Sequence, residues 1–288
     1  MGSTGFQPVG YAGILPAIFV PQQARCLLAP QPRWLCYICA ALCFAAFSRT
    51  AVAAKVLEET IEQKYELDPD ATLSISNTDG AIRIYAAETS EILIQATKRA
   101  YTAERLKGIV VDVQATRKAV TVGTTFPPRK NALSDRSGTV DYIVIVPPAI
   151  KITQLELVNG EVTIEGLRGG SAKAHVTNGW VSGQDCFADL DLSVETGRLD
   201  VFYGWWENHK FSVRGSSDRG IVRAFLPSDA SVMLNATAGT GRIINAFAAQ
   251  KTGANDTVRS LNTVIGSNAE AVIELKAGSG DIQIHKSY

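Results

Sequence analysis

Five aromatic side chains crowd into FYGWWENHKF at positions 202–211 of the sequence. They are Phe202, Tyr203, Trp205, Trp206 and Phe211. Flat aromatic faces stack on sugar rings and on partner side chains, and binding residues concentrate on loops that a rigid scaffold holds in place. The sequence therefore predicts a binding site formed by Phe202, Tyr203, Trp205 and Trp206. Packing of the same rings into the core is the alternative.

Three carboxylates lie close together in GQDCFADLDL: Asp185, Asp189 and Asp191. Paired carboxylates perform glycoside hydrolysis, so a polysaccharide hydrolase or lyase on a β-helix scaffold is an alternative function. Strand alternation would place Asp189 and Asp191 on one outward face, where solubilising side chains are the simpler explanation. We therefore predict no catalytic residues and no enzyme activity.

The sequence contains no complete metal or cofactor motif. His175, His209 and His285 are far apart and belong to no His-x-His or His-Glu-x-x-His pattern. A calcium-binding Gly-Gly-x-Gly-x-Asp repeat is approached once, in AGSGDI at 277–282, and one copy cannot form the shared sites. Walker loops, nucleophile elbows and Cys/His zinc spacings are also absent from the sequence. We predict no cofactor and no metal.

A repeat with a period near 20 residues must position these side chains. Seven glycines mark it, and each is followed two positions later by Ile, Val or Leu. The glycines are Gly80, Gly160, Gly179, Gly197, Gly220, Gly241 and Gly280. Apolar and polar residues alternate on both sides of the corner, as at Leu155 and Leu157 before Gly160. Each unit is therefore predicted to be a strand, a glycine corner and a second strand.

Two assemblies are compatible with this repeat. Asn-Gly between alternating strands predicts hairpins, and thus an antiparallel meander or β-sandwich. A fixed period instead predicts coils stacked about 4.8 Å apart, a β-solenoid or β-helix-like fold. We favour the stack, because the aliphatic residues after the glycines would then form one buried ladder. The 39 residues from Gly241 to Gly280 are interpreted as two periods with one degenerate unit. The fold class is all-β in either assembly.

The first 53 residues have the composition of a targeting segment. Residues 1–57 contain no Asp or Glu, and the run 34–47 is uncharged and apolar. Arg33 precedes this run and Ala51-Val52-Ala53 follows it, which predicts a signal peptide cleaved after Ala53. The run is too short for a permanent membrane span. We expect residues 1–53 to be an N-terminal extension and signal peptide, and the mature protein to be extracytoplasmic, either periplasmic or secreted to the cell surface.

Residues 54–288 are predicted to form a single β-repeat domain. Irregular strands occupy 70–148 and the repeats occupy 149–288, without a linker between them. Removal of the leader would leave a net charge near −3, which gives no reason to expect nucleic acid as a partner or stable membrane insertion. Only Cys186 would remain of the five cysteines, and we expect its thiol to be buried.

The order of the motifs resembles a bacterial protein family. VDYIVIVPPA at 140–149 is followed by LELVNGEVTIEGLRGG at 155–170, AHVTNGWVSG at 174–183 and LSVETGRLDV at 192–201. This order is similar to that of the bacterial putative adhesin family with β-strand repeats, which is also described as a domain of unknown function. The resemblance covers about residues 70 to 285. It implies an extracytoplasmic, β-solenoid-like domain and no catalytic residue.

These observations predict an exported, non-catalytic, envelope-associated binding or structural module that is adhesin-like. The expected partner is a glycan or an envelope protein, and an accessory role in an envelope signalling system is a further alternative. The irregular N-terminal strands would cap one end of the stack. The final strand, Asp281 to His285, would leave the other end open to self-association.

Overall fold

The computed structural model describes residues 55–128, 138–247 and 258–287. The chain divides into two units, Met1–Ala53 and Ala54–Tyr288. The first unit, with the predicted signal peptide and its cleavage site after Ala53, lies outside the described residues. Within the described ranges, no helix has both the length and the apolar character needed to cross a membrane.

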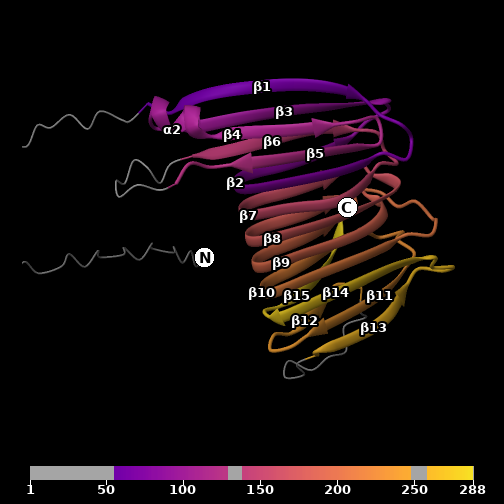
Figure 1. Cartoon of the computed structure of the whole chain (residues 1–288). Coiled ribbons are helices and arrows are strands. Elements are labelled where there is room, and N and C mark those ends of the chain that lie inside the picture. Colours follow the sequence, from indigo (N-terminus) through magenta and orange to yellow (C-terminus); the bar gives the residue numbers. More distant parts are fainter. Residues whose placement is uncertain (1–54, 129–137, 248–257, 288) are drawn as a thin grey trace, which may run out of the picture. The chain divides into compact units, whose positions relative to one another are not determined.

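The described unit is all-β (Figure 1). One mixed sheet of 15 strands contains both parallel and antiparallel pairs and does not close on itself. A short helix, α2 (Ala103–Gly108), precedes β4, and the hydroxyl of Thr102 caps it by accepting a hydrogen bond from the Arg105 backbone N–H. The strands are β1 (Leu57–Glu66), β2 (Thr72–Ala86), β3 (Glu91–Ala100), β4 (Val110–Ala115), β5 (Ala119–Thr125), β6 (Thr139–Val146), β7 (Lys151–Glu165), β8 (Arg168–Gln184), β9 (Phe187–Phe202), β10 (Ser212–Pro227), β11 (Val232–Ala238), β12 (Ile243–Asn245), β13 (Ser260–Ile265), β14 (Ala271–Ser279) and β15 (Ile282–Ser287).

The repeat strands pair in parallel and in register. β7 pairs with β8, β8 with β9 and β9 with β10, and at each pairing the glycines of the two strands lie side by side. The hairpin alternative would instead pair the two halves of one strand across its own glycine. The observed pairing joins equivalent positions of successive repeats, as the stacked arrangement requires.

Close backbone contact explains why each corner is a glycine. Gly160, Gly179 and Gly197 have φ angles of 136°, 142° and 142°, which residues with a Cβ rarely adopt. A Cβ on Gly179 would also overlap the carbonyl oxygen of Gly160, and one on Gly197 would overlap that of Gly179. Each corner thus rests directly on the backbone of the corner before it.

The predicted ladder of aliphatic side chains is buried. The residues two positions after the seven glycines are all at most 8% exposed, and they are Ile82, Val162, Val181, Leu199, Val222, Ile243 and Ile282. Leu155 and Leu157, on the other side of the Gly160 corner, are also buried. Burial of one such side chain stabilises a fold by about 1.5–3 kcal/mol, so the ladder is a major source of stability.

The C-terminal repeat strands do not pair in chain order. β14 and β15 pair with β10, and β11 and β12 pair with the far sides of β14 and β15. A Cβ on Gly280 would therefore meet the backbone of Gly220, and one on Gly241 would meet that of Gly280. The interpretation of the Gly241–Gly280 interval as two periods is wrong, because the chain skips one level of the stack and returns to fill it.

This order also corrects the expectation for the final strand. Asp281 to His285 does not form an open end, because β15 lies between β10 and β12. The strand order ends instead at β13, which pairs antiparallel with β11.

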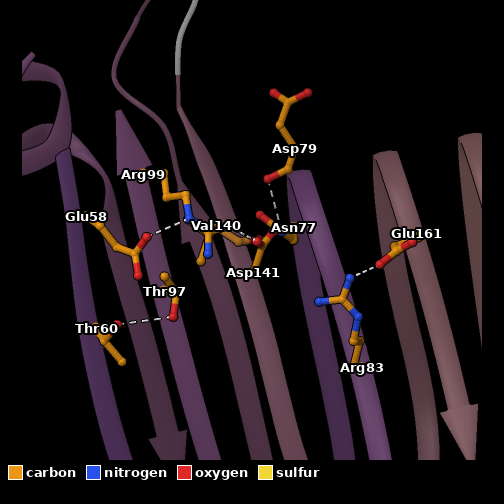
Figure 2. A network of polar contacts seen from close by, with 10 residues as sticks. All are labelled: Glu58, Thr60, Asn77, Asp79, Arg83, Thr97, Arg99, Val140, Asp141 and Glu161. Atoms are coloured by element: carbon orange, nitrogen blue, oxygen red, sulfur yellow. Dashed lines mark hydrogen bonds and ion pairs between the residues drawn. The ribbon is translucent and has the colours of Figure 1, made fainter. Parts of the chain in front are cut away.

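The N-terminal strands cover the other end of the stack. β2 pairs with β7 on one side and with β5 and β6 on the other, and β3 and β1 continue the sheet in antiparallel fashion. Polar contacts connect these strands (Figure 2). Arg99 bonds Glu58 and Asp141, and the buried Asn77 donates to the Val140 carbonyl at 2.8 Å. Arg83 of β2 also pairs with Glu161 of β7, so the N-terminal strands have both backbone and side-chain links to the first repeat strand.

We expect Gly179→Ala to lower the free energy of unfolding by about 3 kcal/mol or more, because it combines a strained φ with steric overlap. Gly169→Ala is the matched control, since Gly169 has a φ of 70° but no atom lies within 4 Å of the point that its Cβ would occupy. It should cost only about 1–2 kcal/mol. Urea denaturation followed by circular dichroism compares the two variants. Equal losses would contradict the direct contact between corners.

Candidate functional site

The four aromatic residues predicted to bind a ligand differ in their exposure to solvent. Phe202 ends β9 on the outer face and is 37% exposed, and Trp205 in the following corner is 46% exposed. Tyr203 is buried, and its hydroxyl donates to the Cys186 carbonyl at 2.8 Å. Trp206 packs against the core. That these four residues contact a ligand stays a prediction, but they do not share one surface.

The inward rings form an aromatic cluster inside the corner. Tyr203 lies 5.3 Å from Phe187 and 5.4 Å from Trp206, and Trp206 lies 5.6 Å from Phe211, measured between ring centroids. Such distances are typical of packed aromatic pairs. The packing alternative therefore describes Tyr203, Trp206 and Phe211.

Trp205 lies on the outside of the same corner. Its indole N–H donates to Glu207 at 3.1 Å, and the guanidinium carbon of Arg168 lies 5.9 Å from its ring centroid. Arg168 also pairs with Glu207, and this hydrogen bond lowers the pKa of that carboxyl. Trp205 is thus an exposed ring with a fixed orientation.

Two of the three neighbouring aspartates, Asp185 and Asp189, accept hydrogen bonds from the corner that follows β9. Asp185 accepts from the Gly204 backbone N–H at 2.7 Å, and Asp189 accepts from the backbone N–H and hydroxyl of Ser212 at 2.9 and 2.8 Å. Asp189 and Asp191 share the exposed face of β9, as predicted. These bonds anchor both ends of the corner that follows β9.

Asp191 and two of the three histidines also make contacts within the fold. Asp191 lies in register between Lys173 of β8 and Arg214 of β10, a charge ladder on the outer face. His175 contacts the Ser193 hydroxyl at 3.0 Å, and His209 approaches the Phe187 carbonyl at 3.3 Å. Across the described ranges, no three His, Cys, Asp or Glu side chains group as metal ligands would.

A different surface is formed by the parts of β8, β9 and β10 that follow their corner glycines. The first, third and fifth residues after each glycine point outward, because alternate side chains of a strand face opposite ways. In β8 these residues are Trp180, Ser182 and Gln184. Register places beside them Arg198, Asp200 and Phe202 of β9, and then Ile221, Arg223 and Phe225 of β10. Six of these nine residues line a groove of about 240 Å³, here named the outer groove, and they are Trp180, Ser182, Gln184, Asp200, Phe202 and Phe225.

Asp200, which lines the outer groove, is buried and paired with arginine. Asp200 is 5% exposed and accepts two hydrogen bonds from Arg223, Nε to Oδ1 at 2.8 Å and Nη2 to Oδ2 at 2.6 Å. This bidentate pairing raises the pKa of Arg223 above its ordinary value. Arg198 Nε lies 3.1 Å from the same carboxylate, so two guanidinium groups share one negative charge. The one charged residue that lines the groove, Asp200, therefore has two positively charged partners beside it.

Aromatic rings form the walls of the outer groove. The Arg198 guanidinium carbon lies 4.3 Å from the Trp180 ring centroid, a cation–π contact that holds both side chains. At the other side, Phe202 lies 6.1 Å from Phe225, and Phe225 stacks on His285 at 4.9 Å with an interplanar angle of 16°. Flat apolar faces thus border hydrogen-bonding groups.

Of the groove residues, sequence reasoning identified only Phe202. The others lie 18 to 23 residues apart in successive repeats, so no short window contains them. A usable pattern does exist at the fifth position after each glycine, where Gln184, Phe202, Phe225 and His285 follow one another in the stack. Comparing that column would have found the aromatic wall.

The chain is similar to several solved bacterial structures at low sequence identity. A putative cell adhesion protein from Clostridium sporogenes is 14% identical, covers 79% of this chain and 100% of its own, and has a TM-score of 0.49. A putative adhesin from Bacteroides fragilis is 12% identical, with 78% and 97% covered and a TM-score of 0.31. A putative lipid binding protein from Parabacteroides distasonis is 10% identical, with 78% and 96% covered and a TM-score of 0.28.

The first two names match the kind of family that the sequence resembles. No protein-family model matches the chain, and no curated protein matches it in sequence.

Cys186 is buried, as predicted, beside the aromatic corner. Its thiol lies 3.2 Å from the Gln184 carbonyl and 3.3 Å from the Ile164 carbonyl. Burial raises the pKa of the Cys186 thiol to about 12, because the thiolate would lose its hydration. The thiol therefore stays protonated at any pH near neutrality.

We expect Cys186 in the folded protein to react with iodoacetamide at pH 8 at least about a thousandfold more slowly than in the unfolded protein, because only the thiolate attacks. Peptide mass spectrometry of samples quenched over time, with and without urea, measures the modified fraction at this residue. Comparable rates in both samples would contradict the burial of the thiol.

Proposed function

We propose that this chain is an exported, non-catalytic binding module of the bacterial cell envelope, and that its outer groove binds a glycan. The proposal has three parts, which are the scaffold, the ligand surface and the compartment. Each is supported by different residues and has its own test.

The proposed scaffold is a β-solenoid of repeats of about 20 residues. Support comes from the glycine column, since each corner contacts the backbone of the next and equivalent residues pair in register. A solenoid repeats its outward side chains every 4.8 Å or so along the stack. Such a rigid, periodic surface suits a ligand that is itself a chain of similar units.

The observation that carries the ligand proposal is the composition of the outer groove. A sugar ring has an apolar C–H face, which stacks on aromatic rings such as Phe202 and Phe225. Its hydroxyl groups form hydrogen bonds with planar polar groups. Gln184 and Asp200 offer these beside the rings, and Arg223 is bonded to Asp200. Asp200 and Arg223 hold each other in place, so binding would cost little side-chain entropy.

The size of the groove and the charges beside it restrict the class of glycan further. A volume of about 240 Å³ is smaller than the roughly 300–1,000 Å³ of typical small-molecule pockets, so the groove fits one ring of a longer chain. Arg198 and Arg223 share the single carboxylate of Asp200, which leaves positive charge for an anionic substituent. We therefore favour polysaccharides that carry carboxylates, such as those containing uronic acids.

Binding to immobilised polysaccharides, both neutral and uronate-containing, tests the ligand proposal. We expect Phe202→Ala and Phe225→Ala each to weaken binding about three- to tenfold, the usual value of one aromatic contact. Trp205→Ala is the matched control, because this ring is exposed but lies in the corner outside the groove. Weaker binding only in Trp205→Ala would locate the site at the corner, and no binding by the unaltered protein would refute the glycan.

The composition of residues 1–53 supports export and cleavage after Ala53. We expect the mature protein to begin at Ala54 and to be recovered from the extracytoplasmic fraction. Mass spectrometry of the N-terminal peptide checks this, with Ala53→Glu as a variant that should retain the leader. Folded protein in the cytoplasm with residues 1–53 attached would contradict export.

A further inference from the structure

The open edges of the sheet differ in how they are protected. Within the described residues, β1, β4, β12 and β13 each pair with a strand on one side only. Unpaired edge strands recruit further strands unless charges, prolines or short length prevent it. We therefore compare the sequences of these four edges.

Three of the edges carry features that discourage pairing. β1 (LEETIEQKYE) has four glutamates and a lysine, and β4 (VVDVQA) has Asp112 at its centre. β12 is only three residues long. β13 (SLNTVI) has six residues without a charge or a proline. Of the described edges, β13 is therefore the least protected against strand addition.

The pairing of β13 with β11 shows which of its backbone groups point outward. The Ala238 N–H donates to the Arg259 carbonyl at 2.8 Å, so these opposite residues form a hydrogen-bonded pair. In an antiparallel ladder such pairs alternate with pairs that do not bond. Leu261, Thr263 and Ile265 therefore bond toward β11. The N–H and C=O groups at Ser260, Asn262 and Val264 face away from it.

The side chains at the outward-bonding positions are also accessible. Ser260, Asn262 and Val264 are exposed, whereas Leu261 and Thr263 are half-buried and Ile265 is buried. Val264 is 58% exposed, and it lies opposite Met233 of β11, which is 41% exposed. The edge thus combines outward-facing backbone groups with one exposed apolar pair, Val264 and Met233, on the same surface.

We propose that a second copy of this chain adds its own β13 to this edge in antiparallel orientation, with Asn262 on the two-fold axis. The outward positions are symmetric about Asn262, so Asn262 would pair with itself and Ser260 with Val264 of the second copy. The three pairs would form about six main-chain hydrogen bonds. No like charges would face each other, in contrast to the glutamate-rich β1.

The interface would be weak on its own. Two six-residue strands bury less than the roughly 1,600 Å² of a standard stable interface, so we expect a dissociation constant in the micromolar range. The dimer would present two outer grooves to one polymer and gain avidity. The pairing itself rests on the edge geometry and not on the proposed ligand.

Sedimentation velocity of the purified full-length protein, over about three orders of magnitude in concentration, tests the pairing. We expect the unaltered protein to shift from monomer to dimer. Asn262→Lys and Asn262→Asp should each raise the Kd about five- to tenfold, because each places two like charges opposite one another on the axis. An equimolar mixture of the two variants should dimerise again, since Lys then faces Asp.

Val110→Lys is the matched control, because Val110 is 54% exposed on the edge strand β4. It should leave the Kd of the unaltered protein unchanged. A protein that remains monomeric over the whole range would overturn the proposal. So would single variants that dimerise as well as the unaltered protein, or a mixture that fails to regain dimerisation.

Discussion

Direct contact between glycine backbones at successive corners is the constraint on which the rest of the structure depends. Gly160, Gly179 and Gly197 approach so closely that no side chain can be accommodated between them. This contact fixes the register of the neighbouring strands, because a slip of one residue would bring a Cβ into the column. Register in turn decides which side chains are buried, since a slip would turn the entire inward set outward.

The outer groove follows from the same register. Asp200 meets Arg223 and lies beside Ser182 only because their three glycines are aligned. The irregular order of the last coils adds the aromatic wall, since β15 lies beside β10 and brings His285 onto Phe225. Had β12 followed β10 in chain order, Ala246 would occupy that place.

The features that could be predicted from the sequence are those encoded within one repeat. The strand–glycine–strand unit and the buried ladder depend on local alternation and were found. The order of the last coils was not, because it depends on which distant strands pair. The aromatic run predicts a single binding site, although strand alternation already separates its first two members. Phe202 ends a strand facing outward, and Tyr203 turns inward. The groove was missed because its residues come from different repeats, and only the stack brings them together.

Disulfide trapping tests the central claim most directly, in a chain whose five cysteines are first replaced by alanine. Glu156 and His175 lie in register on neighbouring strands, about 4.8 Å apart, within the range that a disulfide spans. A hairpin turning at Asn159 and Gly160 would instead oppose Glu156 to Thr163. Stacked corners predict that cysteines at 156 and 175 oxidise readily, whereas cysteines at 156 and 163 remain reduced. The opposite pattern would contradict the glycine column and everything derived from it.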